Sequence, residues 1–143
     1  MPIPRILIVD DEERFRTTLG KRLTERELDV VTVGSGIEAL DEVKHRLYDV
    51  IILDIKMPGL DGIETLAEIK KINPNIEVIL LTGHASIDSA VDGMRSGAYD
   101  YVLKPCDIEQ LLEKINGAYE VKAMRDERLR QAEIRRLVDR SPT

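Results

Sequence analysis

The chain has 143 residues, of which 43% are apolar and 34% charged, with a net charge of −6. This size and composition are typical of one folded domain with a short appendage and argue against a disordered chain. The single Cys106 excludes a disulfide framework and a thiolate-cluster metal site. No apolar run approaches the about 18 residues of a membrane span, and the first residues do not resemble a secretory signal. We therefore expect a soluble cytoplasmic protein without membrane or direct nucleic-acid contact.

Five short apolar runs mark the expected strands. They are rich in Val and Ile and show no polar alternation, which is typical of strands buried on both faces of a parallel sheet. The gap after each run is long enough for one crossover helix. The runs occupy residues 6–9, 30–33, 50–53, 78–81 and 101–103.

Between the runs, apolar residues recur with helical period, and each stripe predicts a helix that packs this face on the sheet. Capping-box spacing predicts helix starts at Ser35, Asp61 and Asp107, and Gly97 predicts a helix end. Alternating strands and helices predict an α/β fold with helices on both faces of the sheet. The stripes are Phe15, Leu19 and Leu23; Ile37, Leu40, Val43 and Leu47; Ile63, Leu66, Ala67 and Ile72; Ile87, Ala90, Val91 and Met94; and Ile108, Leu111, Leu112 and Ile115.

The charge is unevenly distributed along the chain. Residues 119–143 carry seven basic and five acidic side chains, a balance of +2, whereas residues 1–118 carry −8. We therefore expect a domain over 1–118 and a helical extension over 119–143. The apolar positions of the extension do not keep a clean heptad, so a solvated linker and a dimerising coiled coil both remain open.

Polar side chains follow several of the runs, at the strand ends where open parallel sheets bind ligands. Asp10 and Asp11 follow the first run, Asp54 the third, Thr82 the fourth and Lys104 the fifth. Clustered carboxylates need a counter-charge, and oxygen ligands favour Mg²⁺ over zinc. A carboxylate held beside a metal ion and an ammonium group can act as a nucleophile and accept a phosphoryl group.

The segments ILIVDDE, ILDIKMPGLDG, LLTGHAS and YVLKP, in this order over residues 4–118, resemble the receiver domain of bacterial two-component response regulators. The resemblance implies a flavodoxin-like (βα)5 fold with strand order 2-1-3-4-5, which brings the acids together at the switch point. It implies that Asp54 accepts the phosphoryl group. It also implies a Mg²⁺ site made by Asp10, Asp11, Asp54 and the backbone carbonyl of Lys56.

The same resemblance implies roles for the later strands. Thr82 is the switch hydroxyl, Lys104 is the lysine that contacts the phosphoryl group, and Tyr101 is the aromatic side chain that rotates on activation. The bond between Lys104 and Pro105 corresponds to one that is cis in the family. We also hypothesise that the side chains of Lys56 and His84 overhang the site and set the rate at which the phosphoryl group is lost.

These residues predict a phosphorylation-controlled switch rather than an enzyme. The resemblance implies that a histidine kinase supplies the phosphoryl group and that the face made by the fourth helix, fifth strand and fifth helix changes between two packings. The stretch HASIDSAVDGMRSGAYDYVLKPCDIEQLL resembles receivers of nitrogen-regulator-type AAA+ transcription activators. We therefore expect an effector, an AAA+ or DNA-binding domain, outside this chain, with pairing of two copies through that face or through 119–143. A stand-alone regulator is the alternative.

Two other functions fit a parallel sheet with acidic strand ends less well. A phosphatase with an aspartate nucleophile needs Asp-x-Asp-x-Thr after the first strand, whereas this chain has Asp10-Asp11-Glu12. A flavin-binding module needs a hydroxyl- and glycine-rich loop there, and the two acids repel an FMN phosphate. Turnover of a phosphoester or a yellow colour would favour these alternatives.

Overall fold

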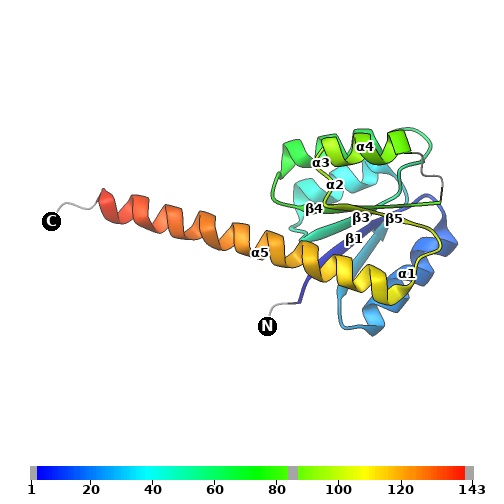
Figure 1. The fold of residues 1–143 in the computed structure, drawn as a ribbon, viewed down its shortest axis with the longest axis horizontal. Helices are drawn as coiled ribbons and strands as arrows, with labels where there is room; N and C mark the ends of the chain where they lie inside the picture. The colour runs from blue at the N-terminus through cyan, green and yellow to red at the C-terminus, as the bar shows by residue number, and fades with distance from the viewer. Residues whose placement is uncertain (1–2, 84–86, 141–143) are drawn as a thin grey trace.

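A computed structural model describes residues 3–83 and 87–140 and shows a parallel sheet between two layers of helices (Figure 1). All five predicted strands and the helices between them are confirmed. The strands are β1 (Arg5–Val9), β2 (Asp29–Val33), β3 (Val50–Leu53), β4 (Glu77–Thr82) and β5 (Asp100–Leu103). The helices are α1 (Glu13–Glu25), α2 (Gly36–His45), α3 (Gly62–Ile72), α4 (Ile87–Arg95) and α5 (Ile108–Asp139).

The strand order is β2-β1-β3-β4-β5 with every neighbouring pair parallel, as expected. In this order the chain leaves β1 for one edge of the sheet and returns to place β3 on the other side of β1. The register pairs Val9 with Leu53, the last residues of β1 and β3. The residues that follow β1 and β3 therefore lie side by side at the carboxyl edge of the sheet.

The sheet separates two hydrophobic cores, because successive residues of a strand point to opposite faces. One core contains Leu7, Leu53 and Leu80 and lies under α2, α3 and α4. The other contains Ile8 and Ile52 and lies under α1 and α5 (Figure 1). The central strands β1, β3 and β4 are buried almost throughout, which explains their unbroken apolar runs. The edge strands β2 and β5 are partly exposed, so the expected burial on both faces is wrong for them.

Helix termini follow the predicted signals with one difference. The side chains of Ser35 and Asp61 accept hydrogen bonds from backbone N–H groups three residues later, at 3.1 and 2.9 Å. Asp107 caps α5, but it accepts from the backbone N–H of Glu109 and not from that of Gln110. Gly97 follows α4 with φ of +103°, a conformation that favours glycine.

The predicted inward stripe of α2 is wrong in part. The helix ends before Leu47, which is 79% exposed, and Ile37 is 70% exposed. Val43 does face the core. The first turn points small residues inward: a Cβ on Gly36 would lie 2.2 Å from Oγ1 of Thr65, so α2 approaches α3 more closely than a larger side chain allows.

The predicted inward stripe of α4 is wrong for Val91 and Met94, while Ala90 is partly buried. Val91 and Met94 are 41% and 46% exposed, while the side chain of Ile87 lies outside the described part of the chain. A Cβ on Gly93 would lie 2.2 Å from Cδ1 of Leu80. The helix therefore approaches the sheet through a glycine, and its apolar side chains turn toward the surface.

The fifth helix runs far beyond the sheet as one continuous helix of 32 residues (Figure 1). Lys122 contacts Asp49 at 3.1 Å, and Arg125 contacts Glu77 at 2.7 Å, at the amino edge of the sheet. The described residues after Arg125 are exposed. The domain boundary at residue 118 stays a prediction. Among residues 3–83 and 87–140, no helix combines the length and apolarity that a bilayer span requires.

Candidate functional site

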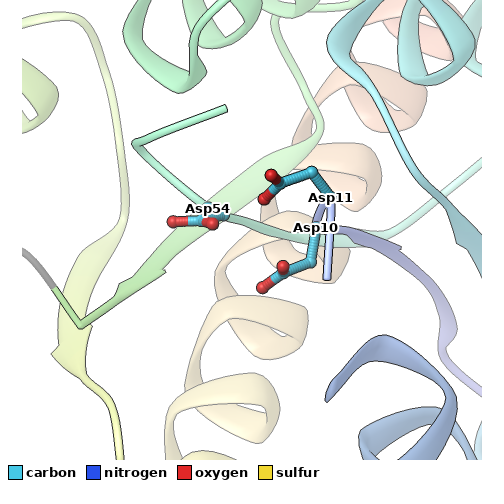
Figure 2. Close-up of side chains that lie close together, drawn as sticks. All are labelled: Asp10, Asp11 and Asp54. Atoms are coloured by element: carbon cyan, nitrogen blue, oxygen red, sulfur yellow. The ribbon is translucent and has the colours of Figure 1, made fainter. Parts of the chain in front are cut away.

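The ends of β1 and β3 bring three carboxylates together. Hydrogen bonds continue the sheet past both strands, from Asp54 N to Val9 O at 2.9 Å and from Asp10 N to Val33 O at 3.2 Å. As a result, oxygen atoms of Asp10, Asp11 and Asp54 lie within 4.8 Å of one another. Figure 2 shows the three side chains gathered at one place, two from the end of β1 and one from the end of β3.

Burial distinguishes the three acids. Asp10 is 2% exposed and Asp54 6% exposed, whereas Asp11 is open to solvent. Oδ1 of Asp10 accepts a hydrogen bond from Glu12 N at 2.9 Å. Asp10 does not cap α1, because the N-cap is Glu12, whose side chain makes no capping bond. The buried pair lines the floor of the site and Asp11 its rim.

Lys104, which follows β5, brings a positive charge to the buried pair. Its Nζ donates to Oδ2 of Asp10 at 2.6 Å and lies 3.8 Å from Oδ2 of Asp54. Its side chain is 14% exposed, so these contacts are screened less than surface ion pairs. The bond between Lys104 and Pro105 is cis, as the resemblance implies.

The surroundings of Asp54 disfavour its charged form. Burial raises the pKa of this carboxyl, and the neighbouring Asp10 carboxylate raises it further. Lys104 acts in the opposite direction, followed by weaker hydrogen bonds from Lys56 N, at 3.3 Å, and from Thr82. The attraction of one lysine therefore does not outweigh burial and a second acid.

The excess of negative charge at the site indicates that the cluster can hold a cation. Three carboxylates face one ammonium group, and the clustered donor atoms are oxygens. Hard divalent ions such as Mg²⁺ prefer such ligands and retain water molecules in the rest of their shell, which the exposed side of Asp11 permits. The residues present therefore fit a metal of this class.

Thr82 and Tyr101 occupy different surroundings. Thr82 ends β4, is fully buried, and reaches Asp54 through its hydroxyl. Tyr101 lies on β5, where it is half-buried and packs against the core under α2, α3 and α4. The predicted site thus assembles around Asp54 and Thr82, while Tyr101 belongs to the adjoining core. His84 lies outside the described residues, and the side chain of Lys56 is exposed.

Two residues of α1 adjoin the site although the sequence analysis did not assign them to it. The ring centroid of Phe15 lies 4.0 Å from Nζ of Lys104. Nη1 of Arg16 donates to the backbone carbonyl of Asp10 at 3.2 Å. Their position in the sequence could have indicated this, because α1 begins shortly after the acids and side chains of its first turn reach the same edge of the sheet.

Comparisons with known proteins agree with this geometry. Residues 6–116 match the family described as the response regulator receiver domain. The transcriptional regulatory protein ZraR of Klebsiella oxytoca is 42% identical over 106 residues, which cover 74% of this chain and 24% of ZraR. The transcriptional regulatory protein GlrR of Escherichia coli K12 is 39% identical over 138 residues, covering 96% of this chain and 30% of GlrR.

Among solved structures, the beryllofluoride-activated receiver domain dimer of NtrC4 is 37% identical with a TM-score of 0.78, covering 82% of this chain and 98% of that one. These matches confirm the expected resemblance to receivers of nitrogen-regulator-type activators. The chain spans about a quarter of the length of ZraR. The matched family, the parallel fold and the clustered strand-end acids lead to one conclusion: this chain belongs to the receiver domains of two-component response regulators.

Proposed function

We propose that Asp54 is the phosphoacceptor of a switch that a histidine kinase controls. The observation that carries the proposal is the carboxylate of Asp54 at the end of β3, held beside Lys104, Thr82 and two further acids. The exposed edge at Asp11 leaves a path for a donor. The chain is then a signalling domain that promotes its own phosphorylation and dephosphorylation, and not an enzyme acting on a separate substrate.

The acids are the metal ligands in this proposal. Asp10, Asp11 and Asp54 supply carboxylate oxygens, and Lys56 supplies its backbone carbonyl. When bound, Mg²⁺ offsets the negative charge of the phosphoryl oxygens. The residues in contact with Asp54 keep its carboxylate in place before the donor arrives.

In the transfer step, a carboxylate oxygen of Asp54 donates a lone pair to phosphorus and forms an O–P bond. The P–N bond to the histidine of the kinase breaks, and its electron pair stays on the imidazole nitrogen, which takes a proton. Lys104 then contacts a phosphoryl oxygen as a point charge, and the hydroxyl of Thr82 donates to another. Both groups need only small movements, because they already adjoin Asp54.

The output face in this proposal lies over α4, β5 and the start of α5. Val91 and Met94 on α4 and Leu103 on β5 are large apolar side chains that remain exposed there. Movement of Thr82 toward the phosphoryl group would let Tyr101 turn inward and change this face. The curated relatives are named transcriptional regulatory proteins, so we propose that residues 1–118 act as receiver, 119–143 as helical extension, and an effector domain or a second copy as partner.

The test is phosphorylation of the pure chain by acetyl phosphate with Mg²⁺, followed by intact-mass measurement. We expect one phosphate per chain, removed by hydroxylamine as for an acyl phosphate. Asp54→Asn should abolish it, whereas Asp41→Asn, which changes an exposed acid on α2, should not. A phosphate retained in Asp54→Asn, or equal labelling without any divalent ion, would overturn the proposal.

A further inference from the structure

Phe15 contacts the ammonium group of Lys104. It is neither one of the clustered acids nor a residue at a strand end, so the proposed function gives it no role. The residue lies in the first turn of α1 and is partly buried against the core under α1 and α5. The centroid of its ring lies 4.0 Å from Nζ of Lys104, well within the about 6 Å over which a cation is attracted to an aromatic face.

Lys104 has competing carboxylates to contact. Nζ lies 2.6 Å from Asp10 and 3.8 Å from Asp54 on the buried side of the site. On the outer side it lies 3.9 Å from Oε1 of Glu12, whose side chain is 68% exposed. A lysine side chain has four flexible carbons, so the balance between these carboxylates depends on what else confines the ammonium group.

We propose that Phe15 is a positioning residue that holds the ammonium group of Lys104 over Asp10 and Asp54. This inference rests on the proposed function, because it assigns a role in phosphorylation of Asp54. The ring excludes water from one side of the ammonium group and attracts it through its π face. An aliphatic side chain at this position fills the space without that attraction, and Lys104 then turns more often toward Glu12 and solvent.

The surroundings of Phe15 explain how the ring keeps its place. Phe15 shares a groove between α1 and the start of α5 with Leu19, Cys106 and Ile108. Leu19 is buried and anchors the next turn of the same helix. The ring is therefore supported from the helix side and presents its face to Lys104.

The first readout is structural and does not require phosphorylation. In proton NMR spectra of the full chain, we expect the ring current of Phe15 to shift the Hε protons of Lys104 upfield. Phe15→Leu and Phe15→Met should remove this shift, and Phe15→Tyr should keep it. Ile108→Val, which trims the same groove without facing Lys104, should leave it unchanged. An identical Lys104 signal with and without the ring would overturn the inference.

The second readout is the initial rate of phosphorylation by acetyl phosphate with Mg²⁺. We expect Phe15→Leu and Phe15→Met to be about fivefold slower and Phe15→Tyr to recover the rate. Adding Glu12→Gln to Phe15→Leu should restore part of the rate, because the competing carboxylate is gone; a merely structural loss would not respond. Equal rates in the wild-type and Phe15→Leu proteins, or no recovery with Glu12→Gln, would overturn the positioning role. A wild-type chain that takes up no phosphate would instead refute the proposed function and leave the ring-current result to judge the contact.

Discussion

Removing the guanidinium group of Arg125, on the second half of α5, should destabilise the folded chain. Nη1 of Arg125 donates to Oε1 of Glu77 at 2.7 Å and to Oδ1 of Asn75 at 3.2 Å. Glu77 begins β4 and is 5% exposed, so its carboxylate has little access to water. Arg125→Ala therefore leaves a buried charge without its principal partner.

The expected loss of unfolding free energy depends on how deeply Arg125 and Glu77 are each buried. Loss of one partner of a fully buried pair costs about 3–5 kcal/mol. The side chain of Arg125 is 40% exposed, and the charge of Lys70 also acts on Glu77, so the cost here is smaller. We expect a loss of about 2 kcal/mol in the free energy of unfolding, which corresponds to a fall in Tm of about 7 °C for a domain of this size.

Urea unfolding of the full chain measures this difference. Arg128→Ala is the matched control, because Arg128 lies on the same helix three residues later and is exposed; it should change stability by less than about 0.5 kcal/mol. The double variant Arg125→Ala with Glu77→Gln should lose less than Arg125→Ala, since no unpaired carboxylate remains. Equal stabilities of Arg125→Ala and Arg128→Ala would refute the reasoning.

Two further predictions concern the backbone beside the site and a buried phenol. Gly62→Ala should lower the free energy of unfolding by about 2 kcal/mol and slow phosphorylation, because the new Cβ would lie 2.2 Å from the backbone oxygen of Asp54. Urea unfolding measures the stability, and Gly83→Ala is the control, because a Cβ there would lie 3.8 Å from its nearest neighbour, Cβ of Lys104. Burial, followed by the hydrogen bond to Glu42, raises the pKa of Tyr48 to about 12, so the folded state keeps the proton that the unfolded state begins to lose near pH 10. The stabilisation from the Tyr48 proton is fully present below pH 10 and falls by about 1 kcal/mol by pH 11. The difference between the unfolding free energies of the wild-type and Tyr48→Phe proteins, measured at pH 9 and pH 11, tests this loss. A difference that does not change with pH would contradict the raised pKa of Tyr48.

Local sequence patterns determined the elements and the chemistry at their ends. Strands buried on both faces must be apolar throughout, so β1 and β3 could be recognised without knowing their neighbours. The carboxyl ends of parallel strands share one edge, so Asp10, Asp54 and Lys104 could be assigned to one site before any distance was known. The adjacency of β1 and β3 came from resemblance to a family, because spacing alone does not order the strands.

Tertiary packing decided which helix faces turn inward and which distant side chains meet. An apolar stripe shows that a helix has two faces, but Gly93 brings α4 against Leu80 and leaves Val91 exposed. Likewise, nothing local to Phe15 indicates that Lys104, 89 positions later, will lie over its ring. Secondary structure depends on the preferences of neighbouring residues, whereas close approach and charge pairing depend on how several elements fill the same space, and that becomes definite only in the folded chain.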